Sequence, residues 1–262
     1  PGYKGLYVRL VEPTSQQGKE DMFLRGEKQF IAIQDNFLKI PGIAIAYWAS
    51  ATLLNAFLSA EKCGETRKGM VTADNDRFVR YWFEIENDKR AMYVESRESA
   101  VSSLKKWFPY QKGGEYRKWY GNHYNVVNWE NDGYELLNMQ GNGYKVGSTN
   151  HNLEYIFRPA ICWNKITGGP FSARYSPKGF LYDDANPFYS VDIGKENYVL
   201  AALLSRPCLE ISKIINPTIN FQPGNIKNIP IIIRNFNKNR VDEIVDVNIS
   251  ISRSDWDSFE TS

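Results

Sequence analysis

The sequence contains few of the residues that build metal centres or disulfide frameworks. Among its 262 residues there are three cysteines and two histidines. Cys63, Cys162 and Cys208 lie far apart, are odd in number and lack the paired spacing of a zinc site. The sequence therefore predicts neither a metal centre nor a disulfide framework, and it favours a reducing, cytoplasmic compartment.

A long hydrophobic run and a signal peptide are also lacking. The longest apolar stretch, residues 43–60, is interrupted by serines, a threonine and an asparagine, so it is too polar to span a membrane. This stretch predicts a packed helix over residues 43–58, and we expect no membrane contact. Because the chain starts at Pro1 without a methionine, we also expect it to be a piece of a longer protein.

The chain has little net charge. It carries 32 Lys and Arg against 30 Asp and Glu, a net charge of +2. This excludes a polycation that binds nucleic acid over its whole surface, so any nucleic-acid site must come from local clustering. A hydrophobic content of 42% and this length suit an ordinary globular protein with one large domain and appendages.

Motifs for catalysis are missing as well. The sequence has no Gly-x-Ser-x-Gly elbow, no P-loop and no Cys–His pair with a local signature. Asn186-Pro187-Phe188-Tyr189 comes near the Asn-Pro-Pro-Tyr motif with which amino-methyltransferases hold a flipped base. Phe188 replaces the second proline of that motif, and no glycine loop for S-adenosylmethionine precedes it. We interpret the motif as a turn and expect no catalytic residue in this chain.

The polarity pattern predicts an α+β fold that is rich in short strands. Residues 3–11 and 28–33 alternate in polarity, as half-buried strands do, but residues 1–60 contain too few elements to enclose a core. From residue 66 to 192, short β segments alternate with Gly, Asn, Asp and Pro turns. We predict strands near residues 79–86, 91–95, 124–129, 155–162, 171–175 and 179–182.

The last third of the chain is predicted to be mainly helical. Residues 196–215 have the apolar spacing of one long scaffold helix, and residues 240–259 have helical spacing too. Residues 226–233 are apolar enough for a closing strand. Gly141-Asn142-Gly143 predicts a turn.

Residues 105–124 contain seven aromatic residues and five Lys or Arg around a Gly-Gly pair, against one acidic residue. Cations neutralise phosphates, and aromatic planes stack on bases. We therefore predict nucleic-acid contacts from this segment. The alternative is a strand and turn whose rings are core and whose lysines are solvated. The candidate contact residues are Lys105, Lys106, Lys112, Arg117 and Lys118.

Two loops add candidate contacts. Residues 66–78 combine cations, hydroxyls and amides, which can donate to phosphates and read base edges. Residues 163–175 resemble a hairpin with a polar tip, a shape that suits a groove. The alternatives are a solvated loop and an ordinary hairpin. The candidate contact residues are Arg67, Asn75, Arg77, Asn164, Lys165 and Arg174.

These residues resemble a known family. Residues 72–78, Thr-Ala-Asp-Asn-Asp-Arg-Phe, are similar to the Thr-Gly-Asp-Asn-x-x-Phe segment of type IIG-like, adenine-specific DNA methyltransferases. Residues 106–122 and their continuation, 127–133, resemble the signature of the PglX-type methyltransferases of BREX phage-defence systems. Residues 216–230 are similar to the helix-to-strand closure of TaqI-like specificity domains, and residues 254–262 resemble the family's downstream segment. Ala73 departs from the pattern, since relatives often have glycine there.

The resemblance implies a DNA target-recognition domain without its catalytic partner. It places the trailing edge of an α/β methyltransferase domain and a linker at 1–60, the recognition domain at 61–235, and the start of a downstream helical segment at 236–262. S-adenosylmethionine would belong to the missing methyltransferase domain, and this chain would hold no cofactor. The implied partners are double-stranded DNA, the parent's methyltransferase domain and other phage-defence proteins, with the chain itself a monomer.

The residues alone leave other functions open. An aromatic-rich module that binds a protein, without DNA contact, has the same surplus of Trp, Tyr and Arg. A carbohydrate-binding sandwich is a third possibility. DNA binding weakens steeply with salt and a hydrophobic protein contact does not, so the salt dependence of binding separates these classes.

Overall fold

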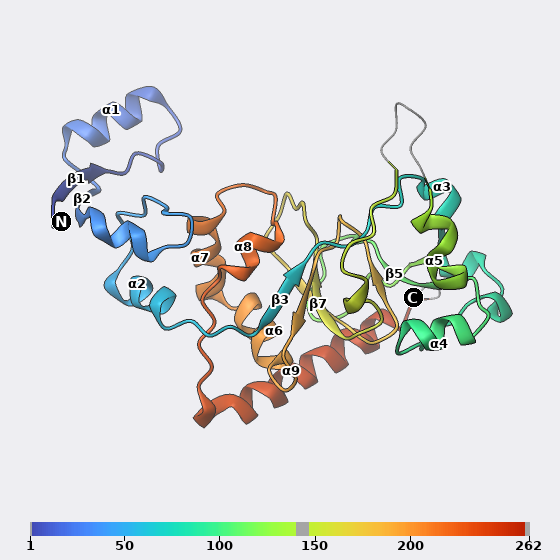
Figure 1. Cartoon of the computed structure of the whole chain (residues 1–262). Coiled ribbons are helices and arrows are strands. Elements are labelled where there is room, and N and C mark those ends of the chain that lie inside the picture. Colours follow the sequence, from blue (N-terminus) through green and yellow to red (C-terminus); the bar gives the residue numbers. More distant parts are fainter. Residues whose placement is uncertain (1, 140–146, 260–262) are drawn as a thin grey trace. The chain divides into compact units, whose positions relative to one another are not determined.

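The computed structural model describes residues 2–139 and 147–259, which form two compact units. Of these, residues 2–61 and 228–232 form the smaller unit, and residues 62–139, 147–227 and 233–259 form the larger. Helices and short strands mix in the chain, which confirms the predicted α+β class (Figure 1). The predicted Gly141-Asn142-Gly143 turn lies outside the described residues.

The smaller unit contains a two-stranded antiparallel sheet. Its strands, close to the two predicted at 3–11 and 28–33, are β1 (Lys4–Val8) and β2 (Gln29–Ile33). Helix α1 (Gln16–Leu24) connects them, and the 3-10 helix η1 (Gln34–Lys39) and helix α2 (Ala51–Leu58) follow. Tyr7 of β1 stacks on Tyr47 with ring centroids 4.8 Å apart.

Helix α2 is shorter than the helix predicted over residues 43–58. Ile43 has a φ of 54°, which is incompatible with a right-handed helix. The Ser50 hydroxyl accepts a hydrogen bond of 3.2 Å from the Leu53 amide, so it caps a helix that begins at Ala51.

The larger unit contains two four-stranded sheets. The first, with the order β3-β10-β7-β8, is antiparallel throughout. The second, with the order β4-β6-β5-β9, is antiparallel except for the parallel pair β5–β9. The strands of the first sheet are β3 (Gly64–Arg67), β7 (Ala160–Trp163), β8 (Ala173–Ser176) and β10 (Phe188–Val191). Those of the second are β4 (Val79–Tyr81), β5 (Trp107–Gln111), β6 (Asn125–Asn128) and β9 (Leu181–Tyr182).

Helices flank these sheets. Helix α4 packs on α5, and α6 packs on the long helix α9 (Figure 1). Helix α6 also packs on β8. The helices are α3 (Asn75–Phe78), α4 (Arg97–Ser102), α5 (Glu130–Leu137), α6 (Glu196–Leu204), α7 (Arg206–Ile215), α8 (Pro223–Lys227) and α9 (Asn235–Trp256). The described part of the unit also contains the 3-10 helices η2 (Trp82–Glu84), η3 (Asn87–Lys89) and η4 (Leu153–Tyr155).

The helix predicted over residues 196–215 is two helices. Ser205 is extended, with φ −73° and ψ 153°, and its hydroxyl accepts a hydrogen bond of 3.3 Å from the Cys208 amide. Pro207 stands in the first turn of α7, where its missing N–H costs nothing. A serine N-cap followed by this proline therefore breaks the apolar pattern into α6 and α7.

Other predicted strands also end early or do not form. The segment predicted at 79–86 leaves the extended conformation after Tyr81, because Glu84 accepts a hydrogen bond of 2.8 Å from the Tyr81 amide and starts η2. The structure has no strand at 91–95, and the predicted strand at 226–233 is wrong because α8 occupies its start. No helix among the described residues combines the length and the apolar character that a membrane crossing requires.

The main core of the larger unit lies where the β4-β6-β5-β9 sheet meets α3 and α5. Phe108, Val127 and Leu136 are completely buried there. A second cluster includes Cys162, Tyr182 and Phe188, with the last two rings stacked 4.2 Å apart. These two cores hold the segment 105–124 and the β7–β8 hairpin in place.

Candidate nucleic-acid interface

Most rings of the segment 105–124 point into the protein. Trp107, Phe108 and Tyr110 of β5 are buried, because β5 lies between β6 and β9 and its residues pack into the core. Tyr116 is the one ring of this segment that is largely exposed, at 51%. The prediction that the β5 rings stack on bases is therefore wrong, and the core alternative holds for them.

Three of the predicted contact cations are engaged near the β4-β6-β5-β9 sheet. Arg77 Nε donates to Glu135 Oε1 at 2.8 Å, and this hydrogen bond lowers the pKa of Glu135. Lys106 Nζ lies 3.8 Å from Glu130 Oε2. Lys105 donates to a main-chain carbonyl, that of residue 88. These cations have local acceptors, which reduces the positive field they offer to a ligand.

Arg117 anchors the segment 115–124 to helix α9. Its Nη1 lies 2.8 Å from Asp255 Oδ2, and its guanidinium lies 5.0 Å from the centroid of the Trp256 ring. Gly121, with φ 120°, packs so closely that a Cβ atom there would lie 2.9 Å from the same ring. Lys118 is half-buried and forms no ion pair with any described residue.

The 66–78 loop meets the Gly-Gly segment at Lys112. Lys112 Nζ lies 2.9 Å from Asn75 Oδ1 and 3.2 Å from Asp183 Oδ2. Burial, followed by the nearby Asp183, raises the pKa of Tyr110, so its hydroxyl stays protonated and donates to Asp183 at 2.7 Å. Ala73 keeps a left-handed φ of 60° where the resembling family often has glycine, so the turn keeps a conformation that glycine favours.

The predicted hairpin of residues 163–175 forms, and its loop approaches the same place. Strands β7 and β8 pair with Trp163 opposite Ala173. At the start of the loop, Asn164 Nδ2 donates to the Gly114 carbonyl at 2.6 Å, and Lys165 forms an ion pair with Asp184. Three separate segments of the chain thus converge.

The Gly-Gly segment and the start of the β7–β8 loop, together with residues 184–185, line a cavity of about 350 Å³, which we call the Gly-Gly cavity. Gly113 and Gly114 have φ values of 85° and 147°, so both need glycine's conformational freedom. The lining residues are Lys112, Gly113, Gly114, Asn164, Lys165, Ile166, Asp184 and Ala185.

Arg174 lies behind this cavity and is completely buried. Its Nη2 donates to Asn164 Oδ1 and to Asn186 Oδ1, both at 2.9 Å. The main chain of Trp119 covers the edge of β8, since its N–H donates to the Ala173 carbonyl at 3.0 Å. The prediction of a direct groove contact is thus corrected for Arg174: its guanidinium faces the interior and acts on the cavity through Asn164.

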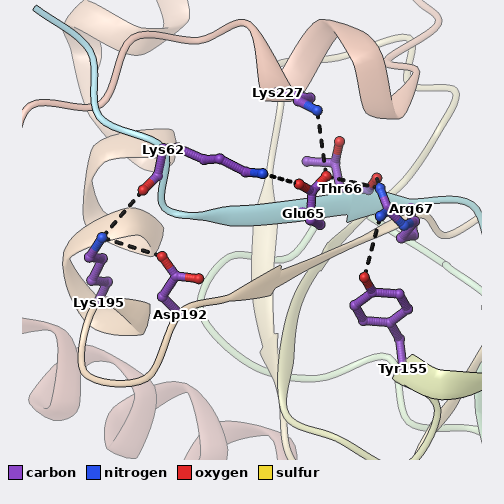
Figure 2. A network of polar contacts seen from close by, with 8 residues as sticks. All are labelled: Lys62, Glu65, Thr66, Arg67, Tyr155, Asp192, Lys195 and Lys227. Atoms are coloured by element: carbon purple, nitrogen blue, oxygen red, sulfur yellow. Dashed lines mark hydrogen bonds and ion pairs between the residues drawn. The ribbon is translucent and has the colours of Figure 1, made fainter.

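Arg67 belongs to a separate group of charges on β3. Three cations converge on Glu65 in Figure 2: Lys62, Arg67 at 3.0 Å and Lys227 at 3.5 Å. The hydrogen bond from Lys62 is the main cause that lowers the pKa of Glu65 to about 2, so this carboxylate stays ionised. Arg67 also donates to the Tyr155 hydroxyl at 3.3 Å.

Two further residues extend this group, which we call the Glu65 cluster. Lys195 Nζ lies 3.3 Å from Asp192 Oδ2 and donates to the Lys62 carbonyl, as Figure 2 shows. Four cations therefore share two carboxylates. Of this cluster, only Arg67 is among the contact residues predicted from the sequence, although Lys62, Glu65 and Arg67 form a charged run near one strand.

Asp183 and Asp184, which form ion pairs with the two cavity lysines, are not among the residues predicted from the sequence. Both directly follow the short predicted strand at 179–182, a position from which side chains reach the end of a sheet. Among the described residues, His, Cys, Asp and Glu side chains form no group of three suited to hold a metal ion.

Two curated proteins match the chain along nearly its whole length, whereas no protein-family model matches it. The adenine-specific methyltransferase PglX of Lacticaseibacillus casei (strain Zhang) is 36% identical over 273 residues, covering 100% of this chain and 22% of the relative. The adenine-specific methyltransferase BrxX of Escherichia coli O9:H4 (strain HS) is 33% identical over 265 residues, covering 99% of this chain and 20% of the relative. The chain spans about a fifth of the length of these relatives. The matches confirm the resemblance seen in the motifs: over its whole length, the chain is similar to one segment of the adenine-specific methyltransferases PglX and BrxX.

Proposed function

We propose that this chain is the DNA target-recognition part of an adenine-specific DNA methyltransferase of the PglX type. One observation carries the proposal: the chain matches PglX and BrxX along its whole length, yet covers only about a fifth of theirs. In this proposal S-adenosylmethionine and the methyl transfer belong to a separate catalytic domain of the parent protein. The partners are double-stranded DNA and that catalytic domain.

The role of the chain is to hold the duplex while the catalytic domain turns an adenine out of the stack. A base inside a duplex cannot reach a catalytic pocket, so such enzymes extrude it and need the flanking DNA to be held in register. Phosphate contacts set the register, and contacts to base edges supply sequence selectivity. Lys112 and Lys165 suit the first task, and the exposed tip of the β7–β8 loop, around Ile166, suits the second.

Local charges support this role. The Glu65 cluster combines four cations with two carboxylates. At the Gly-Gly cavity two lysines face two carboxylates, and the buried Arg174 behind them adds a third cation. Local surpluses of this kind attract a polyanion even though the whole chain carries a net charge of only +2. The buried β5 rings leave little exposed aromatic surface in segment 105–124, so the alternative of an aromatic strip that binds a protein loses its main support.

A salt series tests the proposal. Mobility shift at increasing salt measures the affinity for DNA duplexes with and without the host's methylated motif. The series is run on the full-length parent and on this chain. We expect the logarithm of the binding constant to fall linearly with the logarithm of the salt concentration, with a slope of about −0.9 per neutralised phosphate. The variant with both Lys112→Gln and Lys165→Gln should have a slope shallower by about 1.8.

The matched control is Lys178→Gln, which removes an exposed lysine that is paired with Glu95 outside the cavity. Its slope should equal that of the wild type. Binding to DNA that does not respond to salt, or no binding by the full-length parent, would contradict the proposed function.

A further inference from the structure

The buried Arg174 is a charge without a carboxylate partner among the described residues. Its Nη2 is bonded to two amide oxygens, while its Nε and Nη1 are buried without a hydrogen-bond partner. Burial is the main cause that lowers the pKa of Arg174, because the charged form is the costly one in the interior, while the neighbouring Cys162 acts in the opposite direction; arginine remains protonated at neutral pH. Since no carboxylate among the described residues balances this buried cation, an anion nearby would stabilise it.

The Gly-Gly cavity is the place where this charge meets the surface. Arg174 donates to Asn164 Oδ1, and Asn164 lines the cavity. Because its oxygen must accept from Arg174, the amide of Asn164 has a fixed orientation, with its nitrogen donating to the Gly114 carbonyl. Arg174 thus fixes one wall of the cavity and, through that wall, the glycine loop.

Donor groups remain available in the cavity. An ammonium group has three N–H donors. Lys112 uses two of them, on Asn75 and Asp183, and Lys165 uses one, on Asp184. Among the described residues, the main-chain amides of Gly113 and Gly114 also donate no hydrogen bond. The cavity and its walls therefore combine spare donors with three cations against two carboxylates.

We propose that the Gly-Gly cavity binds one phosphate group, with Lys112, Lys165 and the glycine amides as donors and Arg174 as the positioning residue behind them. Successive backbone N–H groups in a glycine-rich turn form concave anion sites, and lysines add point charges to them. This inference rests on the proposed function, which supplies the phosphate as a phosphodiester of the DNA backbone. Asp183 and Asp184 hold the two lysines in place until the phosphate competes for them.

Two measurements on the 262-residue chain test the site, one with inorganic phosphate and one with DNA. In the first, the ¹H–¹⁵N signals of Gly113 and Gly114 are followed as inorganic phosphate is added. We expect saturable shifts in the wild type and in Lys178→Gln, and an affinity at least about tenfold lower in Lys165→Gln, which is the effect of losing roughly 1.4 kcal/mol of binding. Lys112→Gln is a second variant with the same expected loss.

In the second measurement, the salt dependence of duplex binding is compared among the same variants. Lys165→Gln should lower the slope by about 0.9, the loss of one phosphate contact, while Lys178→Gln leaves it unchanged. If DNA binds but the glycine signals do not respond to phosphate and the slope does not change, the site is refuted and the proposed function stands. If phosphate saturates the cavity but the chain and its parent bind no DNA, the proposed function fails and the occupant is a free phosphate.

Discussion

The Gly-Gly cavity and the Glu65 cluster both combine cations with fewer carboxylates, but their surplus charge lies in different places. In the cavity the surplus is the guanidinium of Arg174, which is completely buried. In the Glu65 cluster it lies on lysines whose side chains reach solvent, with Lys62 70% and Lys227 52% exposed. Water and salt screen exposed charges and hardly affect buried ones.

The number of charges in a region therefore does not predict how strongly they contribute to stability or how sensitive that contribution is to salt. The arrangement at Arg174 is held by hydrogen bonds to Asn164 and Asn186, so it persists at high salt. The lysines of the Glu65 cluster can move, and each exposed pair contributes little to stability. Experiments that separate buried from exposed charge therefore test the comparison directly.

Replacement of Arg174 should have the largest effect. Arg174→Met keeps most of the side-chain volume but removes the donor from the Oδ1 atoms of the buried Asn186 and the half-buried Asn164. We expect the free energy of unfolding to fall by about 2 kcal/mol, because each lost partner costs about 1–3 kcal/mol and removal of the buried charge offsets part of that loss. Urea unfolding at two salt concentrations measures the change, which should be the same at both.

The matched control for Arg174→Met is Arg67→Met in the Glu65 cluster, a change at an arginine with one carboxylate partner. Its expected cost is below about 1 kcal/mol. Equal losses for the two variants, or a gain in stability for Arg174→Met, would remove the distinction between the two regions.

A substitution in the glycine loop of the cavity should cause the second largest loss of stability. Gly114→Ala forces a side chain onto a residue with φ 147°, and its Cβ would lie 3.0 Å from the Asn122 side chain. We expect a loss of about 1–2 kcal/mol of stability from the strained backbone, together with weaker phosphate binding. Calorimetric unfolding provides the first value and a phosphate titration the second.

Gly168→Ala is the control within the β7–β8 loop, because nothing lies within 4 Å of the Cβ position there. This variant should unfold and bind as the wild type does. A neutral Gly114→Ala would mean that the loop tolerates another conformation and that the cavity is not pre-formed.

Local patterns were sufficient to predict part of this architecture. Strand β6 and the β7–β8 hairpin arise from alternation and turn residues, which act over a few positions. Helix α9 follows from apolar spacing. The hairpin pattern also predicts Asn164 and Lys165 as contact residues of its polar loop, and the structure places them in the cavity with Lys112.

The rest depends on contacts between distant segments. Strand β5 is an inner strand because β9, about seventy residues later in the chain, pairs with its far edge, and its Phe108 ring is buried against Phe157, about fifty residues away. Arg174 is buried because the main chain of Trp119 covers β8. Neither partner can be read from the residues beside them, so a sequence pattern of rings and cations could not distinguish a core strand from a binding strip.

Acid should weaken the Glu65 cluster selectively. The pKa of Glu65 is lowered to about 2 from an ordinary 4.5, so its ion pairs stabilise the folded state fully above about pH 4.5. This stabilisation is lost as the pH falls from 4.5 through 2, because the folded state must then take up a proton that the unfolded state already holds. Glu65→Gln should therefore lose stability relative to the wild type at pH 7, with the difference shrinking at pH 3. Urea unfolding of both proteins at pH 7, 5 and 3 measures it.

The smallest expected effect is that of single lysines at the rim of the Glu65 cluster. Lys227 Nζ lies 3.5 Å from Glu65 Oε2, and this side chain is half exposed, so Lys227→Gln should change stability by no more than about 0.5 kcal/mol. That small loss should vanish at 1 M salt, where the Debye length is about 3 Å. The same increase in salt should leave the stability loss of Arg174→Met unchanged. Urea unfolding of the two variants at 0.1 M and 1 M salt therefore tests whether side-chain exposure causes the difference in salt sensitivity. A salt-resistant loss at Lys227 would show that the Glu65 cluster is held as rigidly as the cavity, and the contrast between the two regions would fail.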